Sequence, residues 1–390
     1  MGFLPTKADP NLFYKDKGDH YEYLASYVDD ILVWSKDPMH IMTQLKSKYT
    51  MKGVGIPEYY LGGNVEQLDE HWTKEDIFVG LSARTYIKNV IPKFEETLER
   101  EIKKNKTPMD EKLHPELDDT PLCNDREASL YRSIIGRLNW IITLGRFDIA
   151  YATMSLARFN AAPREGHFKA AVRILGYLKS TPKGTILLDN SYPDHSQYKT
   201  ELKHDWQEFY PDAEEKIPHD MLTPKGKKAR LTVYVDADHA HDQVTRRSVT
   251  GILVLLNNTP IRWYSKRQKT VESSTYGSEL VAARIATEVI MELRYTLRMT
   301  GIPVDGPALM LGDNLSVVLN TTVPSSVLKK KHLGICYHRV REAVAAKVMR
   351  FVHILSGDNL ADLLTKPLPH TTFYNLVKPY LFRVPVHVKG

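Results

Sequence analysis

Cysteine is scarce in this sequence, since Cys123 and Cys336 are the only two among 390 residues. Two cysteines so far apart cannot form the framework of several disulfides that small secreted domains use. Cysteine and histidine also never occur together with the spacing of a zinc site. The scarcity of thiols therefore predicts a protein of a reducing, intracellular compartment, a description that covers both a cytoplasmic particle and the nucleus.

Long apolar runs are missing as well. No stretch has the length that a membrane-spanning helix requires, and Met1 to Lys7 lack the pattern of a secretory signal. We therefore expect no membrane partner. The 53 basic and 47 acidic residues leave a formal net charge of +6, which permits nucleic-acid binding but does not indicate it. Hydrophobic residues make up 42% of the chain, enough for two or three folded domains.

Two adjacent carboxylates, Asp29 and Asp30, stand between two strand-like runs at 21–28 and 31–34. The alternation of apolar residues predicts a hairpin that carries both charges at its tip. Like charges this close repel each other unless a cation lies between them, and Mg²⁺ prefers such hard oxygen ligands. An acidic surface turn is the alternative interpretation of the same pattern.

The pattern of apolar residues, prolines and charges divides the chain into five segments. These are 1–110 (strands and helices), 111–189 (mainly helices), 190–229 (a linker or insertion), 230–370 (strands alternating with helices) and 371–390 (a C-terminal tail). Four prolines and little periodicity are typical of a linker in the third segment, although an ordered insertion is an alternative. In the first segment we expect a helix at 82–98 with Ser82 as its N-cap, interrupted by Pro92.

Four acidic residues of the segment 230–370 stand at comparable places in its elements. Asp236 and Asp313 each follow a predicted strand, Glu279 lies in the first turns of a helix capped by Ser273 or Ser274, and Asp362 opens the last helix. If the first and fourth strands are neighbours, these carboxylates meet at one edge of the sheet. We rank the nearby Asp238 and Glu272 lower, because one points elsewhere by strand alternation and the other precedes the helix.

Four carboxylates at one edge would repel each other unless divalent cations neutralised them. Two cations about 4 Å apart are the usual device for in-line displacement at phosphorus. Because all the ligands are hard oxygens, the expected ion is Mg²⁺ or Mn²⁺. Taken singly, each acid can instead be a turn residue, a solvated helix residue or a charge that complements a helix dipole.

The segment 230–370 also carries several short motifs in a fixed order. They are Tyr234–Asp238, Ser248–Gly251, Ile261–Gln268, Ser278–Leu280, Gly312–Asn314, Lys331–Glu342 and Ala361–Pro367. With these motifs the segment resembles the RNase H domain of copia-type LTR retrotransposon polyproteins. The resemblance implies that Asp236, Glu279, Asp313 and Asp362 are the catalytic acids and the metal ligands.

The first half resembles the reverse transcriptase of the same family from its active-site hairpin onward. The motifs that carry this resemblance are Tyr27–Asp30, Leu61–Gly62, Thr107–Met109, Tyr131–Gly136, Asp148–Ala152 and Arg173–Lys179. The resemblance implies an α/β (α+β) fold, in which a truncated reverse-transcriptase palm and a helical thumb or connection region precede an RNase H-like domain. That domain should have a five-stranded mixed sheet flanked by helices. Asp29 and Asp30 would be catalytic, metal-binding acids of the polymerase.

Two departures from the family's pattern affect these expectations. Gly277 stands two places before Glu279, where the family usually has an acidic residue. In the family, the third catalytic aspartate of the polymerase and the fingers subdomain stand upstream of the position that matches Phe3. We therefore expect a polymerase that is incomplete in this chain, which would be the tail of a longer polyprotein or a truncated gene copy.

The resemblance implies an endonuclease that hydrolyses the RNA strand of RNA–DNA hybrids by two-metal catalysis. Its partners would be the hybrid, a template–primer and upstream polyprotein segments. The alternatives are an inactive transposon remnant that at most binds nucleic acid, and a subunit completed by an upstream chain. Three weaker candidates are His353 as a proton shuttle, the run Lys329–His332 as a phosphate-tracking strip, and His239 with His241 as metal ligands.

Overall fold

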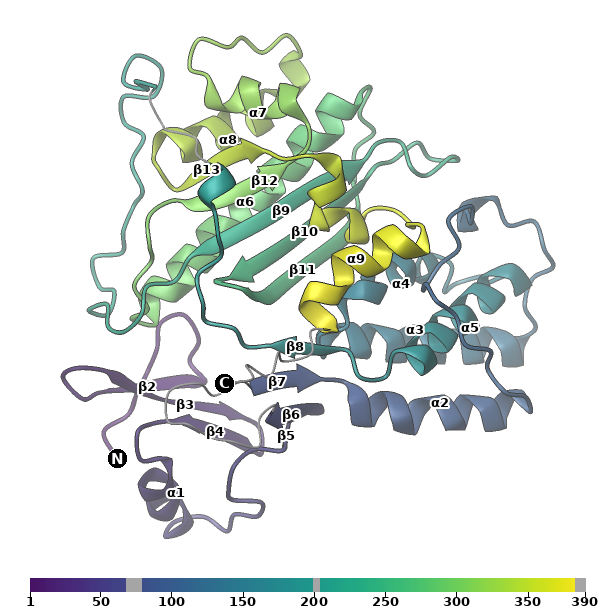
Figure 1. Ribbon diagram of the computed structural model, residues 1–390, viewed down its shortest axis with the longest axis horizontal. Coiled ribbons are helices and arrows are strands. Elements are labelled where there is room, and N and C mark those ends of the chain that lie inside the picture. The colour runs from purple at the N-terminus through teal and green to yellow at the C-terminus, as the bar shows by residue number, and fades with distance from the viewer. Residues whose placement is uncertain (68–78, 199–203, 383–390) are drawn as a thin grey trace, which may run out of the picture.

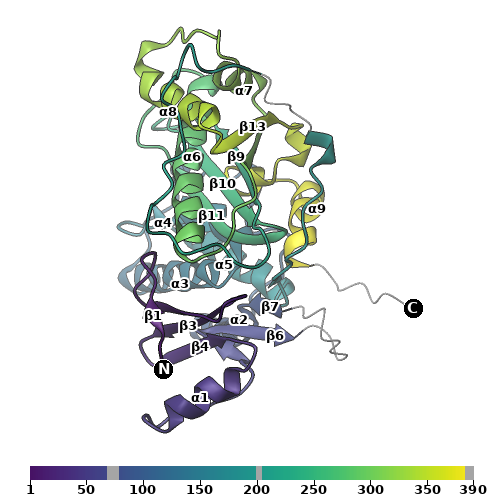
Figure 2. The ribbon, with the colours of Figure 1, turned by 90° about the vertical axis from the view of Figure 1, so that its left-hand side faces the viewer.

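The computed structural model describes residues 1–67, 79–198 and 204–382, which form a mixed α/β protein with three sheets. Strands β1–β4 and β5–β8 make two four-stranded antiparallel sheets, and β9–β13 make a five-stranded mixed sheet. Figure 2 shows the five-stranded sheet standing above the two smaller sheets. The α/β fold class expected from the sequence is confirmed. No helix in the described part of the chain is both long and apolar enough to cross a membrane.

The first sheet carries the predicted acidic hairpin. Its strands are β1 (Leu4–Pro5), β2 (Leu12–Asp16), β3 (Tyr21–Tyr27) and β4 (Asp30–Trp34), and α1 (Pro38–Lys46) follows them. Asp37 caps α1 by accepting a hydrogen bond from the His40 backbone N–H at 3.1 Å. Ile41 and Leu45 of α1 are buried against Leu24 of β3. This small core holds the hairpin formed by β3 and β4 in place.

The second sheet joins segments that are distant in sequence: β5 (Tyr59–Tyr60), β6 (Gly63–Gln67), β7 (Val79–Ser82) and β8 (Thr185–Leu187). After β7 comes α2 (Arg84–Leu98), which runs unbroken through Pro92, so the expected interruption is wrong. A proline inside a helix costs about 3 kcal/mol. Burial of four apolar side chains, each contributing about 1.5–3 kcal/mol, outweighs that cost. These side chains are Ile87, Val90, Ile91 and Phe94.

The start of α2 differs from the expected one as well. Ala83 is the N-cap and makes no side-chain cap, while the Ser82 hydroxyl donates to Glu66 at 2.6 Å in the neighbouring strand β6. The Ser82 hydroxyl therefore donates to the sheet, while its oxygen also accepts a long hydrogen bond, 3.4 Å, from the Arg84 N–H at the start of α2.

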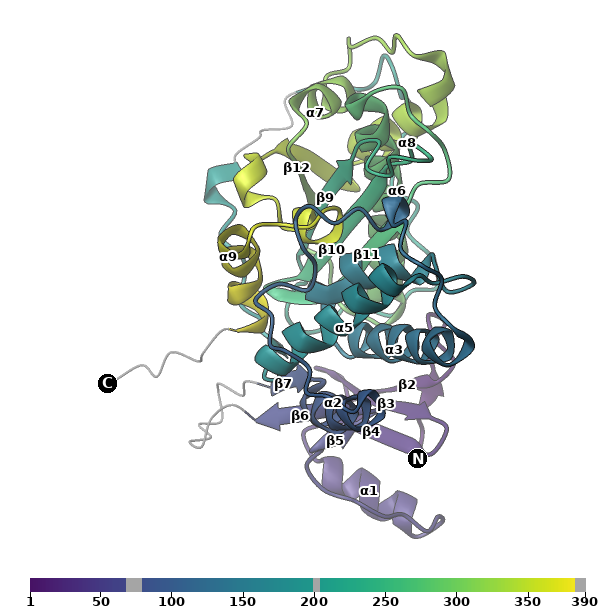
Figure 3. The same cartoon turned by 90° about the vertical axis from the view of Figure 1, so that its right-hand side faces the viewer.

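The segment predicted to be mainly helical contains α3 (Asp125–Thr143), α4 (Ala150–Ala157) and α5 (Glu165–Ser180). Asn124 and Glu127 form a reciprocal capping box at the start of α3. Figure 3 shows α2, α3 and α5 lying side by side. Their shared core includes Tyr131 and Leu138, whose side chains are fully buried.

A buried ion pair ties these helices together. Arg146 donates to both carboxylate oxygens of Asp148, at 3.0 and 2.7 Å, and to the carbonyl oxygen of Thr181 at 2.7 Å. The Tyr177 hydroxyl donates to the same carboxylate at 2.6 Å. Because Arg146 is completely buried, its charge depends on these partners.

The five-stranded sheet has the strand order β11-β10-β9-β12-β13. Its strands are β9 (Leu231–Asp238), β10 (Val249–Leu256), β11 (Thr259–Arg267), β12 (Ala308–Gly312) and β13 (Met349–His353). Strands β9, β10 and β11 are antiparallel neighbours, whereas β12 lies parallel to β9 and to β13. The first and fourth strands of the segment are thus neighbours, as the sequence analysis assumed.

Both faces of this sheet are covered (Figure 2). On one face, Ile252 and Val254 of β10 share a core with α6 (Thr275–Met299) and α8 (Gly334–Ala345). On the other face, the alternate residues Leu253 and Leu255 belong to the core of the helical segment. That second core also takes in α9 (His370–Leu381) and the 3₁₀ helix Leu360–Leu364, where the sequence analysis expected the last helix to begin. The sequence analysis had placed residues 371–381 of α9 in the C-terminal tail, whose remaining part from 383 lies outside the described residues.

The described parts of the segment 190–229 contain one short 3₁₀ helix, Ser196–Tyr198, and contact both the helices of the five-stranded sheet and the first sheet, where the Tyr21 hydroxyl donates to the Thr223 carbonyl at 2.9 Å. Glu215 accepts paired hydrogen bonds from Arg294 and Arg298 of α6, at 2.6–2.7 Å. Trp206 lies against the guanidinium of Arg341, 4.9 Å from ring centroid to carbon. Both interpretations of this segment, a linker or an ordered insertion, stay predictions, as do the five segment boundaries.

Candidate active site

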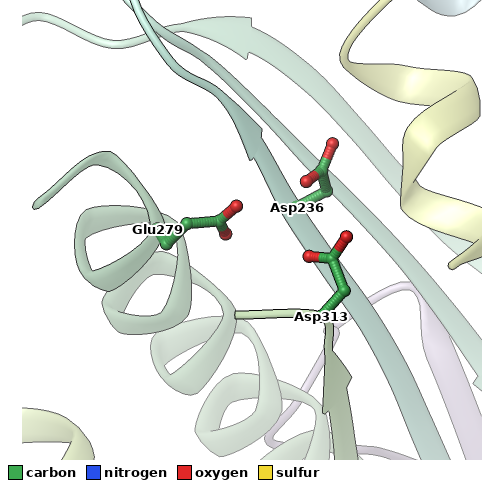
Figure 4. Close-up of side chains that lie close together, drawn as sticks. All are labelled: Asp236, Glu279 and Asp313. Atoms are coloured by element: carbon green, nitrogen blue, oxygen red, sulfur yellow. The ribbon is translucent and has the colours of Figure 1, made fainter. Parts of the chain in front are cut away.

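Three of the predicted acids meet at the edge of the five-stranded sheet. Asp236 lies near the end of β9, and Asp313 follows β12 directly. Because β9 and β12 are parallel neighbours, their carboxyl ends lie at the same edge. Glu279 projects toward them from α6, whose start is capped by the Ser274 hydroxyl oxygen accepting from the Gly277 N–H at 3.3 Å. One carboxylate oxygen from each acid lies within 4.8 Å of the others (Figure 4).

The fourth predicted acid, Asp362, lies beside Asp236 and outside this cluster. It belongs to the 3₁₀ helix Leu360–Leu364, which packs against β9 and β10. Lys366 bridges the two acids, with its ammonium 2.9 Å from Asp362 Oδ1 and 3.7 Å from Asp236 Oδ2. The Thr365 hydroxyl donates a hydrogen bond to Asp236.

The sequence analysis missed Lys366 and Thr365. A signal for the lysine was present, since Lys366 stands four residues after Asp362, the spacing of a local ion pair. No local pattern indicates the contact of Thr365 with Asp236, which lies 129 residues away.

Burial and like charge both act on these carboxyl groups. Burial, followed by the charges of Asp236 and Asp313, raises the pKa of Glu279 well above its usual value. Burial and the neighbouring Asp236 raise the pKa of Asp362 to about 7, although Lys366 opposes the shift. A cation bound among these groups would relieve the repulsion that favours their protonated forms.

The donor set fits a divalent cation. All three clustered side chains offer hard oxygen ligands, the kind that Mg²⁺ and Mn²⁺ take in proteins. They border an open cavity of about 590 Å³, which is also lined by Asp238, His239 and Lys366. In the described part of the chain, this is the one group of three or more acidic, histidine or cysteine side chains close enough to hold an ion.

Neither of the two acids ranked lower joins the cluster. Asp238 faces His241 Nδ1 at 2.5 Å, and His241 Nε2 lies 2.6 Å from the Tyr151 hydroxyl oxygen of α4. Glu272 lies 3.3 Å from His332 Nε2 at the approach to α6. Both acids therefore serve local contacts around the site.

The weaker candidates lie around the same edge. His353 Nε2 donates to the backbone carbonyl of Asp313 at 3.1 Å, so its ring contacts the loop that carries a clustered acid. The basic run Lys329–His332 lies at the start of α6, where Lys330 contacts the Ser274 hydroxyl. Their proposed roles, as a proton shuttle and as a phosphate-tracking strip, stay predictions.

Asp29 and Asp30 lie at a different place. Both are exposed at the turn between β3 and β4, and Val28 before them has φ of 50°, a rare conformation for a β-branched residue. They line a cavity of about 830 Å³ together with the loop at Leu61 and with Trp140 of α3. Within the described residues they join no third side chain that could complete a metal site.

Several known transposon proteins are similar in sequence to this chain. Two Arabidopsis thaliana proteins, the retrovirus-related Pol polyproteins from transposons RE1 and RE2, are 29% and 27% identical to the chain over 391 and 380 residues. The alignments cover 99% and 96% of this chain but only 23% of each relative, so the chain spans about a quarter of their length. A putative transposon Ty5-1 protein of Saccharomyces cerevisiae is 27% identical over 74% of this chain and 80% of its own. No family model matches the chain.

Solved structures of ribonucleases H align with one part of the chain. RNase H1 from Halobacterium salinarum is 15% identical and covers 35% of this chain, with a TM-score of 0.28. LC11-RNase H1, solved in complex with an RNA/DNA hybrid, is 17% identical over the same share, also with a TM-score of 0.28. These scores are too low to carry an argument, so the assignment of the fold depends on the strand order and directions described above.

The strand order and the acid cluster define a mixed α/β fold with a candidate metal centre at the edge of its five-stranded sheet. The chain is thus similar, over nearly its entire length, to retrotransposon Pol polyproteins, and the copia-type resemblance predicted from the motifs is confirmed.

Proposed function

We propose that the segment 230–370 is a ribonuclease H that cleaves the RNA strand of RNA–DNA hybrids, as part of a retrotransposon Pol polyprotein. The observation that supports this function best is the convergence of Asp236, Glu279 and Asp313, with oxygens within 4.8 Å of one another. It occurs at the edge of the sheet where the parallel strands β9 and β12 end. The similarity to Pol polyproteins points to the same chemistry.

The clustered acids would hold Mg²⁺ or Mn²⁺, and Asp362 beside Asp236 would contribute to a second position. A bound divalent cation supplies an activated water at neutral pH and neutralises charge that develops on the phosphate. The chain's own residues prepare this site. Thr365 orients the Asp236 carboxylate by donating a hydrogen bond, and the carboxyl group of Glu279 must release its proton before it can act as a ligand.

Selectivity for a hybrid would come from the shape of the duplex and from contacts with 2′-hydroxyl groups, because chemistry at the phosphate does not require the bases to be read. The run Lys329–His332 lies next to the start of α6, and Thr275 and Glu279 of that helix line the cavity of the acid cluster. Its positive charge supports a role in contacting phosphates on either side of the cleaved bond.

Cleavage of a labelled RNA–DNA hybrid in Mg²⁺ tests this function. Asp313→Asn keeps the size of the side chain and removes one charged ligand, so we expect a loss of activity of about a hundredfold or more. Asp358→Asn, at an exposed acid of the 3₁₀ helix Ser356–Asp358, is the matched control and should cleave like wild type. Equal cleavage by wild type and Asp313→Asn would show that the assignment is wrong and would favour an inactive remnant.

We propose in addition that the reverse-transcriptase part does not polymerise DNA in this chain alone. Asp29 and Asp30 are exposed, and no third acid among the described residues approaches them. Primer extension by the same preparations should therefore give no product. Extension by wild type that Asp29→Asn abolishes would contradict this proposal without affecting the proposed ribonuclease.

A further inference from the structure

Lys366 lies beside the acid cluster, although its sequence motif did not suggest a role for it. Its ammonium lies 2.9 Å from Asp362 Oδ1 and 3.7 Å from Asp236 Oδ2. Asp362 Oδ1 is buried, and its close partner is the Lys366 ammonium. Lys366 therefore compensates the charge of a buried carboxylate oxygen.

The two sides of Asp236 differ in their positive charge. On one side lie Glu279 and Asp313, and no basic side chain in the described residues forms an ion pair with either of them. On the other side lies Asp362, which shares Lys366 with Asp236. One side thus has two carboxylates without an ion-pair partner, while on the other side Asp236 and Asp362 share one lysine.

Lys366 is held in a way that allows it to leave. Its side chain is 34% exposed and lines the open cavity of the site. Arg146, by contrast, is enclosed on all sides by its buried partners. A lysine side chain has a flexible stem of four carbons, so its ammonium can move away while the backbone stays in place.

We propose that Lys366 is the resident cation of the Asp236–Asp362 side, and that a divalent cation binds on this side only by displacing the Lys366 ammonium. The inference depends on the proposed function, because it concerns the same metal site. One divalent cation then binds tightly to Asp236, Glu279 and Asp313, and a second binds weakly between Asp236 and Asp362. Because Lys366 is tethered four residues from Asp362, its local concentration is high, and the second cation must compete with it.

Titration with Mn²⁺, with free Mn²⁺ followed by electron paramagnetic resonance, tests this competition without any substrate. Wild type should show a tight and a weak class of sites. Lys366→Met removes the competing charge, so the weak class should tighten by about tenfold or more, which corresponds to about 1.4 kcal/mol. Lys347→Met, at an exposed lysine after α8, is the control and should leave both classes unchanged.

Two further variants keep the test independent of folding. Lys366→Gln is also neutral but can still donate a hydrogen bond to Asp362, so it carries the same prediction if the methionine variant fails to fold. Lys366→Arg keeps the charge and should retain a weak second class. In EDTA, Lys366→Met should melt at a lower temperature than wild type, because Asp236 and Asp362 then repel each other without compensation, and Mn²⁺ should restore much of the loss.

The outcomes separate the inference from the function on which it depends. Identical weak-class affinities in wild type, Lys366→Met and Lys366→Gln would overturn the role of Lys366 and leave the ribonuclease proposal standing. An equal tightening in Lys366→Arg would also overturn it, because the charge would then not be the cause. No Mn²⁺ binding by any variant would overturn the metal site, and with it the proposed function. Unchanged Mn²⁺ binding with weaker binding of the hybrid to Lys366→Met would assign Lys366 to the phosphate instead.

Discussion

Gly251 lies where the strand pair of Asp236 contacts the 3₁₀ helix of Asp362, and its replacement by alanine tests this contact. Gly251 of β10 is paired with Asp236 of β9. A Cβ atom at Gly251 would lie 2.6 Å from Thr365 Cγ2, 2.7 Å from the Ala361 carbonyl oxygen and 3.0 Å from Leu364 Cβ. These three atoms belong to the 3₁₀ helix of Asp362 and to the residue that follows it. Only glycine therefore permits this close approach.

The expected size of the effect follows from these distances. Contacts below 3.0 Å require movement, and ordinary van der Waals contact begins near 3.4 Å, so the 3₁₀ helix must move away from β10 by roughly 0.5–1 Å. A displacement of about 1 Å in a catalytic group can reduce the rate about a hundredfold. Overpacking of this kind also costs about 1–3 kcal/mol of stability. Gly251→Ala should therefore lose ten- to a hundredfold in hybrid cleavage and melt at a lower temperature.

The tight Mn²⁺ class should survive in Gly251→Ala, because Glu279 and Asp313 belong to elements that the added methyl group does not touch. Single-turnover cleavage, Mn²⁺ titration and thermal melts on one preparation measure all three quantities. Gly136→Ala is the control: Gly136 lies on the exposed face of α3 with nothing within 4 Å of a Cβ atom. It should keep full activity and gain about 0.5–1 kcal/mol in stability. Wild-type cleavage and melting by Gly251→Ala would refute the packing argument.

Two further predictions concern buried charge. Burial and Asp236 raise the pKa of Asp362 to about 7, so the folded state keeps a proton that the unfolded state loses near pH 4. In EDTA, the unfolding free energy of wild type should therefore fall, relative to that of Asp362→Asn, as the pH rises from about 4 to 7. Urea unfolding at several pH values measures this difference, and a difference that stays constant over the range would contradict the shift in pKa. Asp148→Asn leaves the Arg146 guanidinium buried without its counter-charge and should lower the unfolding free energy by about 3–5 kcal/mol. Adding Arg146→Met to that variant removes the unpaired charge, so the further loss of unfolding free energy should be much smaller. Additive losses in thermal or urea unfolding would show that the two charges do not depend on each other.

The sequence predicted the five-stranded sheet and the positions of its acids because both depend on local patterns. Runs of β-branched and aliphatic residues mark strands, and the Ser274 cap marks the start of α6. The neighbouring placement of β9 and β12 was an assumption in the sequence analysis, and the order of the motifs supported it. Once that order holds, Asp236 and Asp313 must meet at the same edge.

The sequence could not predict contacts that depend on packing between distant segments. Pro92 gives a local signal for a break, but the burial of the apolar face of α2 outweighs it. The charges and prolines of 190–229 suggest a linker, while Glu215 forms ion pairs with α6 in a way that no periodicity reveals. The fourth acid shows the same limit. Asp362 lies beside Asp236 and outside the cluster, where a lysine one turn away pairs with it.

The two cores of the chain explain how the candidate site is assembled. Strands β9 and β12 and helix α6, which carry Asp236, Asp313 and Glu279, contribute side chains to the core on one face of the five-stranded sheet. Leu360, Leu363 and Leu364, which flank Asp362, belong to the core on the other face, and that core is continuous with α3, α4 and α5 of the helical segment. The 3₁₀ helix that carries the fourth acid therefore lies between the five-stranded sheet, which it contacts through β9 and β10, and the helical segment, and Gly251 lies at its contact with β10. The proposed tight metal position would thus depend on one core, and the proposed second position on both.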